Sequence, residues 1–180
     1  VGITEDSVVE NEEQLRAQVA WVERQFDQPA LVEDFLPGQE YTALVLGNGP
    51  DREILPGRVG VAGGLYGRHR ILRADMRGVG LTKVTSAGGE LEAVRDIAGR
   101  AAMAMGCLDH VRIDIKTGAD GALRIIEVNG IPGLKPHKSW APQLYTLYHA
   151  SPQGEDEDYR RLIARIVDSA ARRYGLGAER

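Results

Sequence analysis

The stretch VRIDIKTGADGALRIIEVN, residues 111–129, alternates apolar and polar residues on both sides of a Gly-Ala-Asp-Gly turn. This alternation is typical of strands that bury one face, and it predicts two antiparallel strands at 109–116 and 122–129. The dipeptide Asp120-Gly121 between them is a strong signal for a two-residue type I′ hairpin loop. We therefore expect a tight hairpin here.

That loop fixes the register of the hairpin. It places Asp114 opposite Glu127 and Arg112 opposite Asn129, with all four side chains on one face of the sheet. Two carboxylates directly across a ladder have Cβ atoms about 5 Å apart and repel each other, so a cation must compensate the pair. Asp, Glu and Asn offer only hard oxygen ligands, and no His or Cys is nearby. The set therefore favours Mg²⁺ or Mn²⁺ over Zn²⁺.

The same residues permit another interpretation. The hairpin could lie on the surface, with its acids neutralised by Arg112 and Lys116 and no metal between them. A bulge at the turn would also shift the register by one residue and separate the two carboxylates. The segment after the second strand, Gly-Ile-Pro-Gly at 130–133, favours a site, because glycine lets a backbone amide approach a ligand closely. Both interpretations stay open at this point.

The rest of the chain predicts a layered fold. Apolar residues recur at helical spacing after Asn11, at 90–105, at 140–150, and from the acidic run 155–158 to Gly175. Further strands are expected at 30–36, 40–47 and 54–61, and the glycine-rich, basic segment 63–89 is expected to be a functional or mobile loop. Helices and strands do not alternate as β-α-β units. The prediction is an α+β fold with a largely antiparallel sheet and packed helices.

Composition narrows the class of protein. The 180 residues carry a formal net charge of -4, which argues against a nucleic-acid coat because phosphate binding favours a basic surface. The single cysteine, Cys107, excludes a disulfide-stapled secreted domain. No apolar run approaches the roughly 18 residues of a membrane span. We expect a cytoplasmic protein with no membrane or nucleic-acid partner, and a homodimer stays open.

Several motifs together resemble one family. Arg112-Ile-Asp114, Ile126-Glu127-Val-Asn129 and Pro132-Gly133 are similar to the metal-binding and catalytic end of the ATP-grasp ligases, most like the D-alanine–D-alanine ligase branch. The segment LVEDFLPGQE, residues 31–40, is similar to that branch's nucleotide strand and turn. Val1-Gly-Ile3 and the helix after Asn11 look like the stretch that follows the family's phosphate loop. The resemblance runs from Val1 to about Pro142.

The resemblance implies an ATP-grasp C-terminal domain over 1–180, as a fragment that lacks the N-terminal substrate domain and the central phosphate-loop subdomain. It also implies a nucleotide site. Glu33 would meet the adenine amino group, with the backbone of Asp34 and Leu36 around the base. Glu40 would hold the ribose hydroxyls. A basic residue of the 63–89 loop would meet phosphate, and the candidates are Arg73, Arg77 and Lys83.

At the catalytic end, the resemblance implies that Asp114 and Glu127 bind one Mg²⁺ and that Glu127 and Asn129 bind a second. Arg112 and the amide of Gly133 would stabilise the oxyanion of a tetrahedral intermediate, and Ser139 would help hold a substrate carboxylate. The branch usually continues Pro-Gly with Met-Thr and then a serine, whereas Leu134, Lys135 and Pro136 follow here, and one residue is inserted before Ser139. This departure makes the loop basic and leaves the second substrate open, with a different amino acid, a peptide or an acidic substrate as alternatives to D-alanine.

The implied activity is an ATP-dependent carboxylate–amine ligase that joins amino acids or peptides through an acyl phosphate. A carboxylate is a poor acyl donor because its leaving group would be oxide, and transfer of the γ-phosphoryl group of ATP removes that obstacle. The metals neutralise the developing phosphate charge. Two alternatives stay open, namely a non-catalytic ATP-grasp-derived module that binds nucleotide or a partner, and a plain scaffold without a site. The isolated 180 residues are expected to be inactive.

Overall fold

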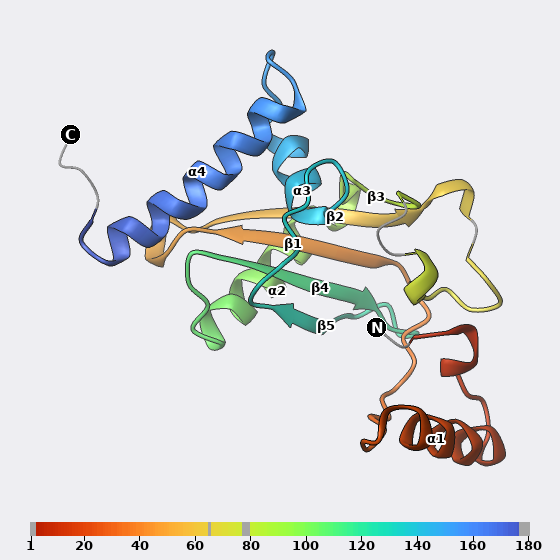
Figure 1. The fold of residues 1–180 in the computed structure, drawn as a ribbon. Coiled ribbons are helices and arrows are strands. Elements are labelled where there is room, and N and C mark those ends of the chain that lie inside the picture. The colour runs from red at the N-terminus through yellow and green to blue at the C-terminus, as the bar shows by residue number, and fades with distance from the viewer. Residues whose placement is uncertain (1–2, 65, 77–79, 177–180) are drawn as a thin grey trace.

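In the computed structural model, residues 3–64, 66–76 and 80–176 are described (Figure 1). Within these residues the chain forms one five-stranded sheet with the order β3-β2-β1-β4-β5, and every neighbouring pair is antiparallel. The strands are β1 (Glu40–Leu46), β2 (Glu53–Val61), β3 (Thr82–Thr85), β4 (His110–Thr117) and β5 (Leu123–Asn129). The α-helices are α1 (Glu12–Phe26), α2 (Leu91–Ala104), α3 (Trp140–His149) and α4 (Glu155–Arg173). Short 3-10 turns lie at Glu5–Ser7, Gly49–Asp51, Ala62–Gly64, Ala74–Met76 and Gly88–Glu90. The α+β prediction with an antiparallel sheet is confirmed.

Helices cover both faces of the sheet (Figure 1). The alternation of the strands sends one set of side chains towards α2, where Val94, Ala98 and Ala102 pack on Ile113 and its neighbours. The other face packs against α3 and α4 through a second cluster that includes Leu44, Leu144 and Leu162. Helix α3 lies over β1, β2 and β3, and α4 contacts β1. The charged residues of β4 and β5 are therefore left beside the helices rather than beneath them.

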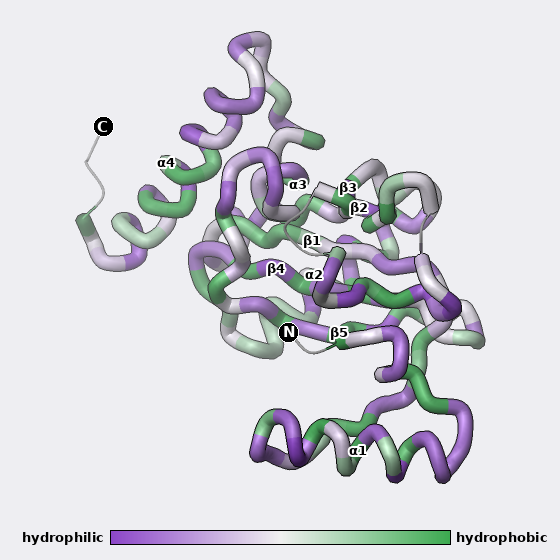
Figure 2. The backbone as a smooth tube through the Cα atoms, turned by 45° about the vertical axis from the view of Figure 1, so that its right-hand side comes forward, coloured by the Kyte–Doolittle hydropathy of each residue, from purple (hydrophilic) through white to green (hydrophobic). Residues whose placement is uncertain are grey.

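Helix α1 differs from the other helices. Its first turn is capped as expected, because the Asn11 side chain accepts a hydrogen bond from the amide of Gln14 at 2.9 Å. However, none of its residues is buried, although Leu15, Val19, Val22 and Phe26 follow a helical apolar spacing. Figures 1 and 2 show it standing apart from the sheet, with both hydrophilic and hydrophobic residues on its surface. No described helix is both long and apolar enough to cross a membrane.

The predicted hairpin register is confirmed at the four polar residues, with Asp114 opposite Glu127 and Arg112 opposite Asn129. The predicted two-residue loop is wrong. β4 ends at Thr117 and β5 begins at Leu123, and the amide of Gly118 donates to the carbonyl of Ala122 at 2.8 Å. A turn at Gly118–Gly121, with Gly121 at a φ of 78°, closes this wider loop.

The wider loop shifts the ladder by one residue, so that Ile115 pairs with Ile125. A bulge between Asp114 and Ile115 then restores the predicted register at Glu127, with Ile126 as the extra residue on β5. The two departures cancel at the acidic pair. Bulges are frequent beside active sites because they re-aim side chains.

Two further predictions are corrected. Residues 30–36 do not form a strand, and β1, the strand that follows them in the chain, is already paired on both sides with β2 and β4. The apolar side chains of Leu31 and Val32 in this segment are exposed instead. The segment 63–89 is not loop throughout, since β3 pairs with the end of β2. The amide of Val84 in this edge strand donates to the side chain of Gln143 on α3 at 3.0 Å.

Candidate functional site

One part of the sheet face beside α3 and α4 is polar. It consists of side chains that the antiparallel register brings together, and we call it the polar stripe: Glu40, Thr42, Arg112, Asp114, Lys116, Glu127 and Asn129. In the β1–β4 ladder, Thr42 lies opposite Asp114 and Glu40 lies opposite Lys116. Directly opposed residues share a face, so the stripe crosses three neighbouring strands. It unites the predicted metal ligands with one of the predicted nucleotide residues.

Asp114 is the most tightly held member of the stripe. Its side chain is only 6 % exposed and accepts four hydrogen bonds. Oδ1 accepts from Thr42 Oγ1 at 2.7 Å and from Arg112 Nε at 2.8 Å. Oδ2 accepts from Arg112 Nη2 at 2.7 Å and from Asn129 Nδ2 at 3.1 Å. A buried carboxylate needs such partners to remain charged, and the bidentate arginine supplies the neutralising charge that the alternative interpretation expected.

Glu127 lies directly opposite Asp114 but is exposed and forms no hydrogen bond or ion pair with any residue that the structure describes. Asn129 donates through Nδ2, which leaves its Oδ1 without a donor in the described part of the chain. The described residues contain no group of three or more His, Cys, Asp or Glu side chains that could hold a metal ion. With the amide oxygen of Asn129 included, the set offers three hard oxygen donors, which fits Mg²⁺ or Mn²⁺.

Arg112 is fixed on two sides. Its guanidinium uses Nε and Nη2 on Asp114, and its Cζ lies 4.8 Å from the ring centroid of Trp140, the first residue of α3. Its Nη1 has no hydrogen-bond partner among the described residues. The arginine is thus pre-oriented yet keeps donors available for a ligand, which is the arrangement that electrostatic stabilisation of an oxyanion requires.

At the end of the stripe where Glu40 begins β1, the neighbouring side chains are basic and largely buried. Lys116 is 6 % exposed, donates to the carbonyl of Arg70 at 2.6 Å and lies 5.4 Å from the ring centroid of Phe35. Burial lowers the pKa of Lys116, whereas the opposed Glu40 acts to raise it. Arg70 donates to the side chain of Gln39 at 2.5 Å and stacks over Tyr66. Positive charge therefore gathers beside Glu40.

The predicted base-binding residues lie next to this end. Gly38 joins their segment to the sheet, since its amide donates to the carbonyl of Thr117 at the end of β4 at 3.0 Å. Glu33 and Asp34 are exposed and Leu36 is half-buried. Phe35 turns towards Lys116 and stands edge-on to His69, with 5.7 Å between the ring centroids. The exposed apolar surface of Leu31 and Val32 is the kind of surface that lines ligand grooves.

The loop after β5 brings Gly133 and Ser139 together. A Cβ on Gly133 would lie 3.0 Å from Ser139 Oγ, and the same oxygen accepts from the amide of Lys135 at 3.0 Å. His137 in this loop has a φ of 57° and contacts two acids at the start of α4, Glu155 at 2.8 Å and Asp156 at 3.0 Å. These contacts raise the pKa of His137. The inserted, basic part of the loop is thus tied to α4.

The predicted phosphate residues are not gathered at one place. Arg73 pairs with Asp75 and Glu5, and Lys83 is exposed on β3. Arg77 lies outside the described residues. Residues 1 and 2, which belong to the Val1-Gly-Ile3 segment of the family resemblance, lie outside them too. Besides Arg112, the stripe itself contains Lys116, and Arg70 contacts Lys116 through its backbone carbonyl. The proximity of Lys116 to Glu40 depends on the β1–β4 pairing, which the sequence does not reveal.

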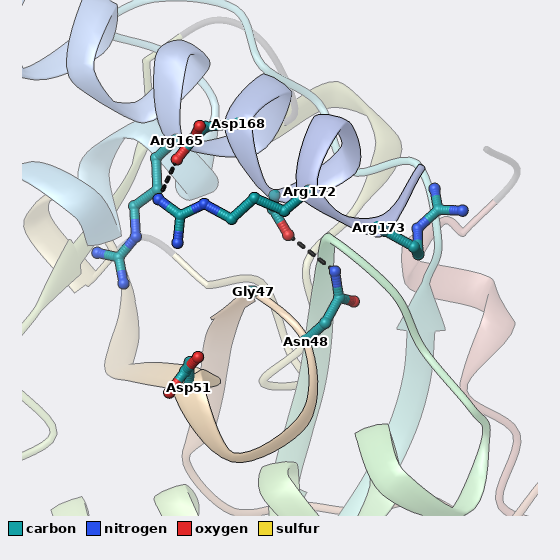
Figure 3. A pocket seen from close by; sticks show the side chains of 8 residues that line it. Gly47, Asn48, Asp51, Arg165, Asp168, Arg172 and Arg173 are labelled. Atoms are coloured by element: carbon teal, nitrogen blue, oxygen red, sulfur yellow. Dashed lines mark hydrogen bonds and ion pairs between the residues drawn. The ribbon is translucent and has the colours of Figure 1, made fainter. Parts of the chain in front are cut away.

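Two cavities lie away from the polar stripe. One, of about 570 Å³, lies between α4 and the β1–β2 turn and is lined by Asn48, Asp51, Arg165, Arg172 and Arg173, among others (Figure 3). Its arginines are already paired, with Glu53, Asp168 and Asp109. The other, of about 410 Å³, lies between β3, α3 and the His137 loop. We place the candidate site at the stripe because the residues predicted for metal binding and catalysis, Asp114, Glu127, Asn129 and Arg112, converge there.

Sequence reasoning missed two residues of the site. Thr42 is a buried hydroxyl in an otherwise apolar strand, and this oddity in EYTALVL is a signal that could have singled it out. Trp140 was not singled out, since it lies in the predicted helix at 140–150. Its position over Arg112 could not have been found from spacing, because 28 residues and a loop separate the two in the chain.

The comparisons with known proteins agree on one group. A family model described as the D-ala D-ala ligase C-terminus matches residues 1–168. A D-alanine--D-alanine ligase from Chromohalobacter salexigens is 34 % identical over 167 residues, which cover 91 % of this chain and 48 % of that protein. The chain therefore spans about half the length of this relative.

Solved structures share the fold. The D-alanine-D-alanine ligase from Coxiella burnetii superposes with a TM-score of 0.61 at 23 % identity. The aligned region covers 93 % of this chain and 42 % of the Coxiella burnetii chain. The D-alanine--D-alanine ligase from Bacillus anthracis complexed with ATP gives a TM-score of 0.58 at 18 % identity. The aligned region covers 91 % of this chain and 48 % of the Bacillus anthracis chain. At these identities the likeness establishes the architecture alone.

Proposed function

Because the chain belongs to the D-alanine–D-alanine ligase C-terminal family, we propose that it forms the catalytic part of an ATP-dependent carboxylate–amine ligase. Such an enzyme joins amino acids or peptides through an acyl phosphate. The observation that carries the proposal is the convergence of Asp114, Glu127, Asn129 and Arg112 on one sheet face. The similar ligase from Bacillus anthracis, whose structure is titled as a complex with ATP, supports ATP as the co-substrate.

The described residues divide the work along the stripe. The segment 33–36 and Glu40 would hold the base and ribose, with Lys116 and Arg70 close enough to meet phosphate. Asp114, Glu127 and Asn129 would hold Mg²⁺, which when bound neutralises charge on the triphosphate. The free Nη1 of Arg112 and the amide of Gly133 would donate to the oxyanion formed when the amine attacks. Ser139 beside Gly133 would hold a substrate carboxylate.

The test uses the intact protein that carries this chain. ADP release is measured after addition of Mg-ATP and D-alanine, and then with other amino acids and dipeptides, because the basic loop at 134–138 favours an acidic or otherwise different second substrate. Glu127→Ala and Asp114→Ala are each expected to lower kcat by at least about 10²-fold, since a metal ion contributes several kcal/mol to such transition states. ADP release that survives both changes rules the ligase out.

A matched control is Asp96→Asn. Asp96 is an exposed acid that pairs with Arg100 on α2, the helix on the opposite face of the sheet. The Asp96→Asn change removes one negative charge at a site remote from the stripe. The kcat of this variant is therefore expected to stay within about twofold of wild type, as for most surface changes. The 180 residues alone are expected to bind nucleotide weakly and to release no ADP.

One observation favours a second candidate, a non-catalytic module that binds nucleotide or a partner. Both carboxylate oxygens of Asp114 already accept from Arg112, an arrangement that is stable without a metal. Binding of Mg-ATP by the intact protein, with no ADP release under any amino acid, supports this module. The ligase is supported by two results together: a nucleotide affinity that depends on Mg²⁺ and on Glu127, and ADP release when an amino acid is added.

A further inference from the structure

Arg112 is gripped by two unlike partners. On one side the carboxylate of Asp114 takes its Nε and Nη2 at 2.8 and 2.7 Å. On the other side the indole of Trp140 lies under the guanidinium, with 4.8 Å between Arg112 Cζ and the ring centroid. A planar guanidinium over an aromatic face is attracted by the ring's electron density and keeps all its N–H groups in the ring-parallel plane free to donate.

The indole is itself held in place. Trp140 Nε1 donates to Thr82 Oγ1 at 3.1 Å, and Thr82 is a nearly buried residue of the edge strand β3. The ring also packs on the cluster of Val59, Val61, Leu72 and Met76. A half-buried tryptophan with its N–H satisfied in this way has little freedom to turn. The fixed ring therefore limits the positions that the Arg112 guanidinium can take.

The two partners would respond differently to a bound cation. Asp114 is a proposed metal ligand, and an oxygen that binds a cation accepts more weakly from Arg112. The ring of Trp140 takes no part in the oxygen donor set, so its contact survives that change. We propose that Trp140 is a positioning residue. It would hold the Arg112 guanidinium in place when the carboxylate of Asp114 also binds the metal. This inference rests on the proposed ligase function for its catalytic consequence.

The contact itself is tested without turnover, by fluorine NMR of the intact protein labelled with 5-fluorotryptophan. The Trp140 resonance is assigned with Trp140→Phe. Arg112→Met is expected to move this resonance and to leave that of Trp21 unchanged, because Trp21 lies on α1, where no residue is buried. The resonance should keep its Arg112-dependence after addition of Mg-ATP. A Trp140 signal that ignores Arg112, or that loses this dependence with Mg-ATP, overturns the proposal.

The catalytic consequence is tested by a double-mutant cycle. Trp140→Leu removes the aromatic face and is expected to lower kcat about 10-fold, less than the loss of an oxyanion donor, while KM for ATP changes by less than about twofold. Trp140→Phe keeps an aromatic face and should restore most of kcat. Because Trp140 acts through Arg112, adding Trp140→Leu to Arg112→Lys should cost little more than Arg112→Lys alone.

Additive losses in that cycle would show a merely structural role and refute the positioning claim. If Trp140→Leu does not fold, the same cycle is run with Thr82→Val, which keeps the indole and removes only its hydrogen bond. Absence of ligase activity in the wild-type protein would contradict the proposed function. In that case the fluorine NMR experiment still decides whether Trp140 holds Arg112 in place.

Discussion

Asp114 and Glu127 face each other across β4 and β5, yet Asp114 is buried under four hydrogen bonds whereas Glu127 is exposed and has no partner among the described residues. The repulsion expected between opposed carboxylates is therefore relieved on one side only. Arg112 forms an ion pair with Asp114, whereas Glu127 lies exposed to solvent. The pair is asymmetric, with one acid built into the fold and the other available for a ligand.

This asymmetry predicts different stability effects for the two acids. Asp114→Asn should lower the free energy of unfolding by about 2 kcal/mol or more, because it leaves the half-buried Arg112 without its counter-charge. Glu127→Gln should change it by less than about 0.5 kcal/mol, as expected for a surface site, although it should weaken Mg²⁺ binding. Urea unfolding and Mg²⁺ titration check both. Equal destabilisation by the two changes would contradict the asymmetry.

The hairpin shows how far sequence patterns reach. Alternation along 111–129 predicted the two faces, and the assumed two-residue loop predicted the opposed residues. The turn type was wrong, because the Asp120-Gly121 signal does not exclude a wider turn that also needs Gly121 at positive φ. The wider turn moved the ladder by one residue, and the extra residue Ile126 moved it back. The residue opposite Asp114 was therefore predicted correctly, although the loop from which it was derived is not the one that forms.

Other parts of the site depended on contacts that no local pattern contains. The run Leu31–Val32 has strand propensity, but a strand forms only where a ladder partner lies beside it, and these residues pair with no strand. The partners of Asp114 and Arg112, namely Thr42 and Trp140, come from distant segments. The order of the motifs was sufficient to indicate the family, because it depends on sequence alone. The side chains that orient the motif residues required the tertiary structure.

Gly38 links residues 33–36, the proposed base-binding segment, to the sheet, so it should be intolerant of a side chain. A Cβ there would lie 2.6 Å from both the Cβ and the carbonyl oxygen of Thr117, and the backbone of β4 cannot yield as a flexible side chain would. Gly38→Ala should therefore displace residues 33–36 and raise the Kd for ATP about 10-fold or more, as misplaced contacts do. Isothermal titration with Mg-ATP measures this.

The matched control is Gly60→Ala, since a Cβ on Gly60 in β2 would meet no atom within 4 Å. Its Kd for ATP should remain close to wild type. If both alanine variants bind equally well, the segment 33–36 does not contribute to the nucleotide site.

His137 should titrate above its usual pKa of about 6.5, because Glu155 and Asp156 both accept from its ring when it is protonated. Its folded pKa is raised, so the contact stabilises the loop below pH 6.5, and this stabilisation is lost as the pH rises through the folded pKa. Proton NMR of the imidazole measures the pKa directly. Glu155→Gln with Asp156→Asn should lower it, whereas Glu92→Gln on α2 should not. A titration unaffected by the double change would contradict the contact.

Asp109 provides the clearest pH dependence of the fold. It lies just before β4 at a φ of 62°, and its carboxylate accepts from Arg173 of α4 at 2.6 and 3.1 Å, with Asn48 and Ser169 as further donors. These hydrogen bonds, that of Arg173 foremost, lower the pKa of Asp109 to about 2. The depressed pKa means that the stabilisation is fully present above about pH 4 and is lost as the pH falls towards 2.

Asp109→Asn should therefore lower the free energy of unfolding by about 2 kcal/mol at pH 7, and the difference from wild type should shrink to near zero at pH 2. Asparagine is the appropriate replacement because it tolerates the left-handed backbone and retains one acceptor oxygen. Urea unfolding at pH 7, 4, 3 and 2 measures the difference. Asp168→Asn, an exposed acid that pairs with Arg172 on the same helix, should cost less than about 0.5 kcal/mol throughout. A constant difference between Asp109→Asn and wild type from pH 7 to pH 2 would show that the charge of Asp109 does not anchor α4 to the sheet.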